Sequence, residues 1–311
     1  MSINKSDKIY IAGHTGLVGS ALVRKFLEAG YTNLLLRKHE ELELTDSAAV
    51  KAFFELEKPD VVIDAAAKVG GIKANSEAPA DFYYINMQIQ QNLIWSAFEN
   101  KAKKFLFLGS ACMYPKECPQ PMKEEYILAG LPEPTNEGYA IAKIGGSRLC
   151  SYLYKQYGVD FISAIPANAY GIGDSFDLNK SHVIPALIRR FHEAKKNNLP
   201  SVTLWGTGKA IREFINTDDM ADACLFLLNN YSGEMPINIG TGEELSMFDL
   251  ALTVKKVTGF NGEILTDPSK PDGMMRRRCD SSRLHSMGWK SSISLENGIK
   301  RLFEWYLKEY K

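Results

Sequence analysis

The chain has 311 residues, a length that fits one large domain or two domains of ordinary size. Hydrophobic residues make up 45% and charged residues 24%, so the chain can bury a large core and is not disordered. Lys plus Arg and Asp plus Glu both number 37, and this formal net charge of +0 excludes a strongly basic nucleic-acid-binding protein and a polyanionic tail.

The first half of the chain alternates short apolar runs with segments of helical periodicity. Strands are expected at Lys8–Ala12, Asn33–Leu36, Asp60–Ala65, Lys104–Leu108 and Asp160–Pro166. Helices are expected between them at Gly16–Ala29, Asp46–Glu57, Asp81–Asn100 and Tyr139–Tyr157. Strands and helices at this spacing predict right-handed βαβ crossovers and a parallel sheet with helices on both faces.

The pattern becomes more irregular after about residue 166. Elements are expected there as a helix at Val183–Lys196, short strands near Val202–Trp205 and Ile237–Gly240, and an amphipathic helix at Leu295–Tyr310. We therefore expect an α/β protein with a cofactor domain over residues 1–166. A smaller substrate-binding lobe is expected over residues 167–311, with some chain crossing back to the first domain.

A glycine-rich turn joins the first expected strand to the first expected helix. Gly13, Gly16 and Gly19 follow the spacing G-x-x-G-x-x-G. The first glycine permits a tight turn, the second lets the backbone approach a pyrophosphate, and the third allows close helix–sheet packing. The helix N-terminus favours the negative charge. This strand–turn–helix context predicts a dinucleotide site in a Rossmann-type doubly wound parallel sheet.

The end of the second expected strand bears on the choice of dinucleotide. An NAD-specific site places an acidic residue there to hold the ribose 2′-hydroxyl, but this chain has Arg37, Lys38 and His39. Cationic groups suit a 2′-phosphate, so the sequence predicts NADPH/NADP as the cofactor. The alternative interpretation is a solvated charge run.

Tyr139 and Lys143 form a Y-x-x-x-K pair that shares one face of a helix. A free tyrosine has a pKa of about 10, and a nearby ammonium is expected to lower it, which makes the phenol a usable proton donor to a carbonyl. Ser110 follows the fourth strand, where ligands of open α/β sheets gather, and can bind the same carbonyl oxygen. The order Gly–Ser–Tyr–Lys predicts a carbonyl reductase.

With these motifs, the chain resembles the extended short-chain dehydrogenase/reductases, and within them it is similar to the GDP-L-fucose synthase family. The resemblance covers nearly the whole length. Its most specific strings are Ala65-Ala66-Ala67-Lys68-Val69-Gly70-Gly71-Ile72 and Ser181-His182-Val183-Ile184-Pro185-Ala186-Leu187, and another is Lys270-Pro271-Asp272-Gly273.

The resemblance implies a role for each matching residue. Ser110, Tyr139 and Lys143 match the reductase triad, and Cys112 and His182 match the base and the acid for epimerisation beside the ketone. Contacts to the nucleotide-sugar are implied for Arg190, Trp205, Arg212 and Asp272. Contacts to the cofactor are implied for Gly13, His14, Thr15, Gly16, Leu17, Val18, Gly19, Arg37, His39, Glu43, Leu44, Ala65, Ala66, Ala67, Leu108, Gly109, Lys143, Pro166, Ala167, Asn168, Ala169 and His182.

The implied reaction is NADPH-dependent reduction at C4 of a GDP-4-keto-6-deoxy sugar with 3,5-epimerisation, which gives GDP-L-fucose or a close relative. A 4-keto group acidifies both neighbouring C–H bonds, and Cys and His have reference pKa values within about two units of neutrality. The resemblance also implies a homodimer in which the expected helices Asp81–Asn100 and Tyr139–Tyr157 pair as a four-helix bundle.

Several positions depart from the family pattern. Thr15 and His39 stand where the family usually has Arg and a basic residue near the 2′-phosphate. Around the sugar, the departures are Gly138, Ala167, Ala169 and Met274-Met275. The smaller side chains favour a roomier sugar pocket, which leaves open a C4 reductase of a GDP-4-keto-heptose or other GDP-4-keto sugar with little or no epimerase activity.

Three other functions of the same fold rank lower. A sugar 4,6-dehydratase would carry an Asp-Glu pair after Ser110, where this chain has Ala111-Cys112. A UDP-sugar 4-epimerase would not match the Cys112 and His182 pair. A non-catalytic NADPH-binding regulator would lack Tyr139 or Lys143, and both are present.

Membranes and metals are not indicated by the sequence. No run approaches the ~18 apolar residues of a membrane span, and the N-terminal residues hold no signal-peptide core, so we expect a cytoplasmic protein. Five scattered cysteines without a C-x-x-C pair favour neither a zinc site nor a disulfide framework, and no metal is expected.

Overall fold

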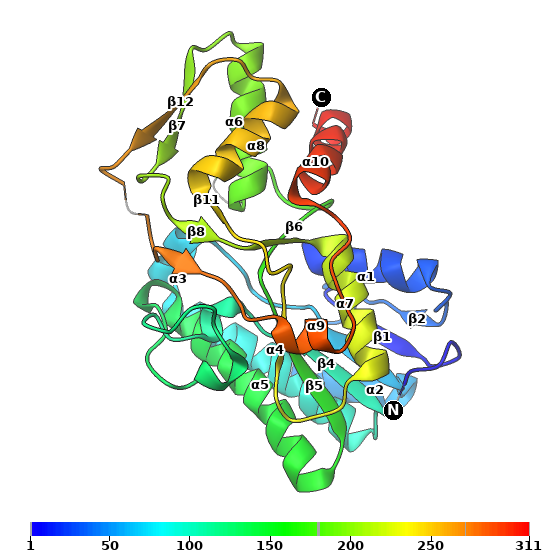
Figure 1. Ribbon diagram of the computed structural model, residues 1–311. Helices are drawn as coiled ribbons and strands as arrows, with labels where there is room; N and C mark the ends of the chain where they lie inside the picture. The colour runs from blue at the N-terminus through cyan, green and yellow to red at the C-terminus, as the bar shows by residue number, and fades with distance from the viewer. Residues whose placement is uncertain (1, 179–180, 271, 311) are drawn as a thin grey trace.

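The computed structural model describes residues 2–178, 181–270 and 272–310. Its central sheet has six parallel strands: β1 (Ile9–Ala12), β2 (Leu34–Leu35), β3 (Val61–Asp64), β4 (Lys104–Leu108), β5 (Asp160–Pro166) and β10 (Ile237–Ile239). Their order is β10-β5-β4-β3-β1-β2, and Figure 1 labels β5, β4, β1 and β2 of this sheet. Because β2 pairs with one edge of β1 and β3 with the other, the winding direction reverses between β1 and β3. Ligands of such sheets bind outside the carboxyl ends of the strands at this reversal.

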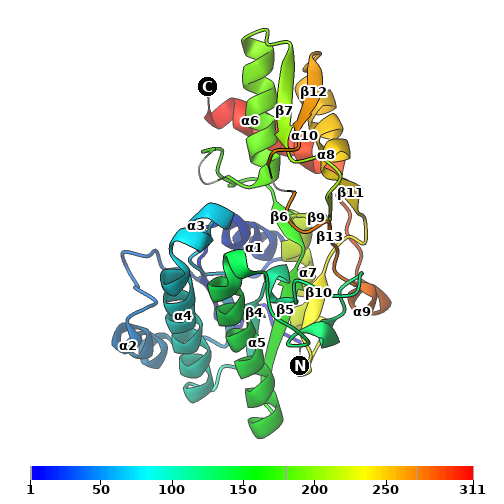
Figure 2. The same cartoon turned by 90° about the vertical axis from the view of Figure 1, so that its left-hand side faces the viewer.

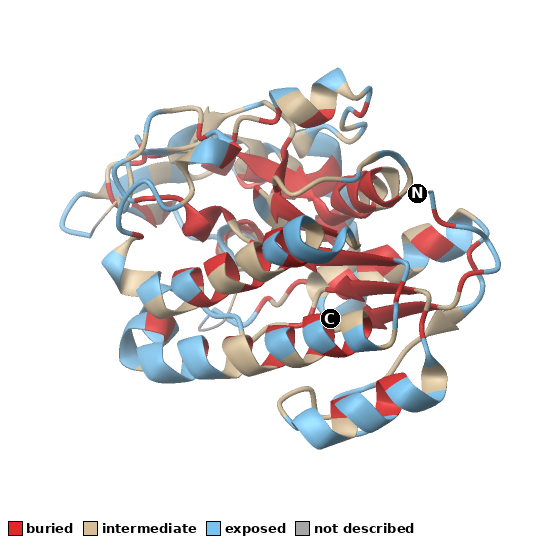
Figure 3. Cartoon of the chain, turned by 90° about the horizontal axis from the view of Figure 1, so that it is seen from below, coloured by how far each residue is buried: buried red, intermediate tan, exposed pale blue. Residues whose placement is uncertain are grey.

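Helices cover both faces of this sheet. On one face, α1 (Leu17–Glu28) packs against α7 (Thr217–Asn230). The other face carries α2 (Ser47–Glu57), α4 (Pro79–Glu99) and α5 (Glu137–Tyr157), and α4 and α5 lie side by side (Figure 2). Seen from below, buried strands lie between helices whose outer sides are exposed (Figure 3). The predicted doubly wound parallel α/β fold is confirmed.

The unbroken apolar runs of the sequence follow from this double covering. In β1, Ile9 and Ile11 belong to the core beneath α1 and α7, whereas Tyr10 belongs to the core beneath α2, α4 and α5. Successive side chains of a strand point to opposite faces, so a strand that is buried on both faces has no polar alternation.

The C-terminal lobe has its own apolar core. Three helices, α6 (Val183–Lys196), α8 (Met247–Thr258) and α10 (Leu295–Glu309), enclose this core with β7 (Ser201–Trp205), which pairs with β12 (Glu263–Asp267). Two further small sheets consist of β6 (Asn168–Tyr170) with β9 (Phe214–Asn216), and of β11 (Leu245–Ser246), β8 (Ile211–Arg212) and β13 (Arg276–Arg277). The remaining short helices include α3 (Ile72–Glu77), η1 (Ala111–Met113) and α9 (Ser282–Ser286).

Each expected strand and helix is present, with bounds shifted by two residues or fewer. The sequence did not indicate α3, α7, α8 or α9, nor the short strands β6, β8, β9, β11, β12 and β13. Residues after 166 also return to the cofactor domain, since β10 extends the large sheet and α7 covers it. Pro271 of the Lys-Pro-Asp-Gly string lies outside the described residues. Within the described ranges, none of the helices has the length and apolarity needed to cross a bilayer.

Candidate active site between the sheet and the lobe

A cavity of about 730 Å³ lies at the carboxyl ends of the central strands and is closed on its other side by the lobe. The predicted site residues that line it are Gly16, Leu17, Val18, Ala65, Ala67, Leu108, Gly109, Ser110, Cys112, Tyr139, Lys143, Pro166, Ala167, Asn168, Ala169, His182, Arg190, Trp205, Arg212 and Asp272. The predicted residues that do not line it are Gly13, His14, Thr15, Gly19, Arg37, His39, Glu43, Leu44 and Ala66.

Two glycines of the loop, Gly13 and Gly19, lie too close to neighbouring backbone to carry a side chain. Gly13 has a positive φ of 74°, and a Cβ there would lie 2.8 Å from the backbone of Ala65. A Cβ on Gly19 would lie 2.0 Å from the Gly13 carbonyl oxygen. The loop therefore holds the first turn of α1 directly against the sheet. Gly16, Leu17 and Val18 are left facing the cavity, which fits a dinucleotide pyrophosphate at a helix N-terminus.

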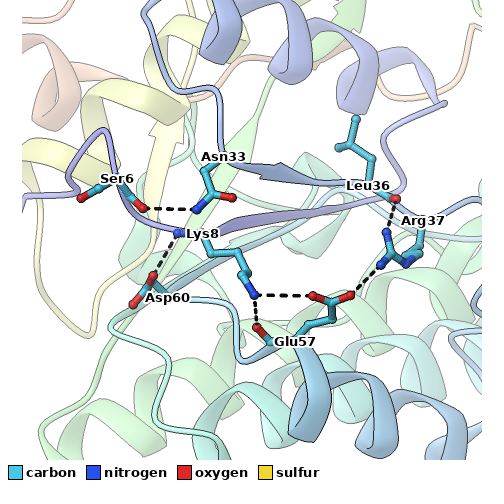
Figure 4. A network of polar contacts seen from close by, with 7 residues as sticks. All are labelled: Ser6, Lys8, Asn33, Leu36, Arg37, Glu57 and Asp60. Carbon is cyan, nitrogen blue, oxygen red and sulfur yellow. Dashed lines mark hydrogen bonds and ion pairs between the residues drawn. The ribbon is translucent and has the colours of Figure 1, made fainter.

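Two of the three residues named after β2, Arg37 and His39, already contact carboxylates of the protein. Arg37 donates to the Glu57 carboxylate at 2.7 Å and to the Leu36 carbonyl at 3.0 Å, and Lys8 also contacts Glu57 (Figure 4). His39 is exposed and lies 3.1 Å from Glu43. The charge of Arg37 is thus balanced by Glu57, an acid of α2 that the sequence interpretation did not consider.

The three residues predicted to form the reductase triad converge on the cavity from two parts of the chain. Ser110 follows β4, and Tyr139 and Lys143 lie in the first two turns of α5. The Lys143 Nζ donates to the Leu108 carbonyl at 2.9 Å and lies 4.7 Å from the centroid of the Phe107 ring. These contacts anchor the buried ammonium at the end of β4.

The expected lowering of the Tyr139 pKa is wrong for this arrangement. Burial raises the pKa of Tyr139 well above its usual value, and the Ser110 hydroxyl opposes this only in part. The Lys143 ammonium donates its hydrogen bond to the Leu108 carbonyl, and it does not lower the pKa of the Tyr139 phenol. Tyr139 is therefore a neutral phenol that can donate a proton or a hydrogen bond.

Cys112 and His182 line the same cavity. The pKa of each is raised, which favours a neutral thiol at Cys112 and an imidazolium at His182. Burial raises the pKa of the Cys112 thiol, and the Arg277 guanidinium counteracts this. His182 precedes α6, and its Nδ1 lies 3.0 Å from the carboxylate of the buried Asp174. This hydrogen bond raises the pKa of His182, so the imidazole favours its protonated form. The pair supplies a thiol and an acid.

The lobe contributes unpaired cations to the cavity. Arg190 and Arg212 donate to backbone carbonyls, at Thr203 and Ile211, and the described residues provide no carboxylate ion pair for either. Burial lowers the pKa of both guanidiniums, which reflects the cost of holding charge there. An anionic ligand would remove that cost. The Trp205 ring is 73% exposed and offers a flat apolar face.

Asp272 lies in the cavity wall but is held by the protein itself. Its two carboxylate oxygens accept hydrogen bonds from the backbone N–H and the hydroxyl of Thr207, both at 2.8 Å. It therefore fixes the turn after β7, and a direct contact to the nucleotide-sugar stays a prediction.

Sequence reasoning missed several polar residues that line the cavity. Asn75 of α3, Asn136 and Arg277 each have a buried polar atom without a hydrogen-bond partner in the described chain. Such orphan atoms at a cavity wall mark positions that a ligand or water would satisfy. The one available signal was the basic run Arg276-Arg277-Arg278 after the Lys-Pro-Asp-Gly string. Nothing in the sequence distinguished Arg277 within it.

Comparison with known proteins identifies the family. The profile of the NAD dependent epimerase/dehydratase family matches residues 9–240. The chain belongs to this family. It is 54% identical to GDP-L-fucose synthase 1 from Arabidopsis thaliana over 305 residues, which cover 98% of this chain and 94% of that protein. The resemblance to GDP-L-fucose synthases expected from the sequence is confirmed.

Two solved structures are similar throughout. A GDP-6-OMe-4-keto-L-xylo-heptose reductase from C. jejuni superposes with a TM-score of 0.94 at 39% identity, covering 99% of this chain and 100% of that one. A GDP-mannoheptose C4 reductase from Campylobacter jejuni with NADP bound has a TM-score of 0.91 at 39% identity, covering 98% and 100%.

Proposed function

We propose that the protein reduces a GDP-4-keto-6-deoxy sugar at C4 with NADPH and also inverts the carbons flanking the ketone, giving GDP-L-fucose or a close relative. The observation that carries this is the presence of two sets of chemical groups in one cavity. Ser110, Tyr139 and Lys143 can reduce a ketone, and Cys112 and His182 can move protons at the carbons beside it. The 54% identity to a GDP-L-fucose synthase supports the same substrate.

Bound NADPH would supply the hydride at C4. The glycine loop would hold its pyrophosphate at the α1 N-terminus, and Lys143 would reach the nicotinamide ribose, as the resemblance implies. Tyr139, neutral because of its burial, would donate its proton to the developing alkoxide while Ser110 holds the same oxygen. The lack of an acid at Leu36-Arg37-Lys38-His39, directly after β2, and the NADP-bound relative support NADPH over NADH.

Epimerisation requires a base and an acid at the carbon that inverts. The hydrogen bond to Asp174 raises the pKa of His182 and so favours the imidazolium, which would return a proton to carbon. Cys112 is a neutral thiol in the free protein, and it must lose its proton before it can act as the base. The Arg277 guanidinium is the charge that favours this loss.

The lobe would hold the nucleotide. Arg190 and Arg212 are unpaired cations at the cavity and suit the diphosphate of GDP, and the exposed Trp205 ring suits stacking of the base. The diphosphate charge would offset the cost of burying the two guanidiniums.

A second candidate is a C4 reductase of a GDP-4-keto-heptose that leaves epimerisation to another enzyme. The two C. jejuni heptose reductases support it, and so do Ala167 and Ala169, which line the cavity with small side chains. The other departures do not add support. Gly138 packs against α4, where a Cβ would lie 2.5 Å from the Pro79 carbonyl oxygen, and neither Met274 nor Met275 lines the cavity.

Isotope exchange distinguishes the two candidates. The protein is incubated in D₂O with NADP⁺ and GDP-4-keto-6-deoxymannose, so that reduction cannot occur, and the sugar is examined by NMR. An epimerase-reductase incorporates deuterium at C3 and C5, and Cys112→Ser slows the incorporation. Reduction with NADPH but no exchange indicates a C4 reductase, and cofactor binding without turnover of either GDP-4-keto sugar indicates a non-catalytic binder.

A further inference from the structure

Asp64 is a buried carboxylate whose presence the fold alone does not explain. It is the last residue of β3 and is 0% exposed. One oxygen accepts a hydrogen bond from the Ala66 N–H at 3.1 Å, and the other has no hydrogen-bond partner among the described residues. Burying a carboxylate with an unsatisfied oxygen costs several kcal/mol unless a nearby charge offsets it.

The sheet register places Asp64 beside Phe107, the residue whose ring Lys143 overlies. Asp64 pairs with Phe107 across β3 and β4, and Phe107 pairs with Ser163 across β4 and β5. Register partners in a parallel sheet project to the same face, and here that face is the one covered by α4 and α5. The Lys143 Nζ lies over the Phe107 ring, so Asp64 and Lys143 flank the same side chain.

Lys143 requires a negative charge at this place. Its ammonium has three N–H donors, and the described protein gives it one hydrogen-bond acceptor, the Leu108 carbonyl. Burial lowers the pKa of Lys143, and the group that most opposes this is Asp64. Cys112 also opposes it, but burial keeps that thiol neutral near pH 7. Without Asp64, the side chain would tend toward the neutral amine, which cannot stabilise the Tyr139 phenolate left after proton donation.

We propose that Asp64 is a positioning residue that keeps Lys143 in its ammonium form in the reductase site. The proposal rests on the proposed function for the role of Lys143 in turnover. Asp64 is not among the residues that line the cavity, whereas Lys143 is, so Asp64 would act through the lysine. On this view, the protein keeps an unfavourably buried carboxylate at position 64 because its negative charge stabilises the Lys143 ammonium.

The groups around Asp64 give the proposal a defined pH dependence. The titratable groups that face it are Tyr10 of β1 and Tyr139, Lys143 and Cys150 of α5. Burial keeps Tyr10 and Cys150 neutral by raising their pKa values, and β4 presents the uncharged Phe107. Burial also raises the pKa of Asp64 to about 6, and Lys143 opposes this rise. Asp64 therefore gains its charge as the pH rises through about 6.

The test compares Asp64→Asn with the native protein across the pH range. Asn mimics the protonated carboxyl, so kcat/KM for reduction should match that of the native protein near pH 5. It should fall below the native value as the pH rises, roughly tenfold by about pH 8 if the Lys143 pKa of the variant has dropped one unit below that pH, because the charged form then falls tenfold. Asp64→Leu, which buries no amide, should give the same divergence if the Asn variant folds poorly. Ser163→Ala removes a polar group from the same row without removing charge, and it should retain the native profile.

NADPH affinity provides a readout that needs no sugar. The Kd is measured by the fluorescence of bound NADPH over the same pH range, because Lys143 faces the cofactor site. The NADPH affinity of the Asp64→Asn variant should equal that of the native protein near pH 5 and become weaker than it above pH 6. Divergent binding without turnover of any GDP-4-keto sugar would support Asp64 while removing the proposed function. Turnover with superimposable profiles in both assays, or an equal loss at every pH, would overturn the role of Asp64.

Discussion

The folding stability of the Asp64→Asn variant should depend on pH differently from that of the native protein. The ordinary pKa of an aspartate is 3.8, and burial raises that of Asp64 to about 6. A raised pKa in the folded state means that folding favours the protonated carboxyl. Below the unfolded pKa the carboxyl is protonated in both states and costs nothing. As the pH rises from about 4 to above 6, the folded state must ionise the buried group or keep its proton, and the native protein loses stability.

The size of this loss follows from the two pKa values. A difference of about two units at 1.36 kcal/mol each gives about 3 kcal/mol of unfolding free energy, present in full above pH 6. For a chain of 311 residues, that corresponds to a shift in Tm of about 5 °C. Asn cannot ionise, so the variant avoids the loss.

Denaturant unfolding at several pH values measures the effect. The difference in unfolding free energy between Asp64→Asn and the native protein should move in favour of the variant by about 3 kcal/mol between pH 4 and pH 7. A constant offset caused by the buried amide does not affect this slope. A pH-independent difference, or a native protein that gains stability over this range, would refute the reasoning. The expected combination is a more stable and less active variant, which is typical of a residue retained for function.

Four further outcomes test the site and the assembly. Tyr139→Phe should lower kcat about 10²-fold with little change in the Kd for NADPH. Lys143→Ala should lower kcat and also weaken NADPH binding. Normal turnover of the Phe variant would exclude Tyr139 as the acid. Glu57→Gln should free Arg37 for a 2′-phosphate and raise the ratio of kcat/KM for NADPH over NADH by about tenfold. If neither Glu57→Gln nor Arg37→Ala changes this ratio, Arg37 does not reach the cofactor. Asp174→Asn should lower the pKa of His182 and slow deuterium exchange in D₂O about tenfold, while the rate of C4 reduction changes little. An equal loss of exchange and of reduction would indicate a folding defect instead. Sedimentation should show a dimer of about 70 kDa, twice the 34.7 kDa of one chain. The reason is the apolar surface that Tyr84, Trp95 and Tyr152 leave exposed on α4 and α5. A monomer at micromolar concentration would contradict this.

Short-range patterns in the sequence were enough to predict the large sheet and the groups that converge on its carboxyl edge. The glycine loop, Ser110 after β4 and the Tyr139–Lys143 pair are each positioned by one strand or one helix, so local periodicity locates them. Asp64 could not be assigned in this way, because it reads as the polar end of an apolar strand. Its meaning depends on Phe107 and Lys143, which are brought beside it by two crossovers.

Electrostatics were the least predictable part of the site. The sequence placed Tyr139 four residues before Lys143, but it gave no sign that the Leu108 carbonyl would take the ammonium or that burial would dominate the phenol. Arg37 appeared free because Glu57 lies 20 residues away in another element. The Asp174 contact to His182 joins residues eight apart in a stretch whose sequence has no periodicity to predict it.

The return of the chain to the large sheet determines how this protein can be divided. A fragment that ended at Pro166 would lose β10 and leave β5 as an edge strand, with unpaired backbone groups open to other chains. It would also lose α7 and expose the apolar side of α1 to water. The complementary fragment would carry an isolated strand and a helix without their partners. Neither half is therefore a portable module, and a fusion or a split reporter should place its junction in a surface loop rather than between the two lobes.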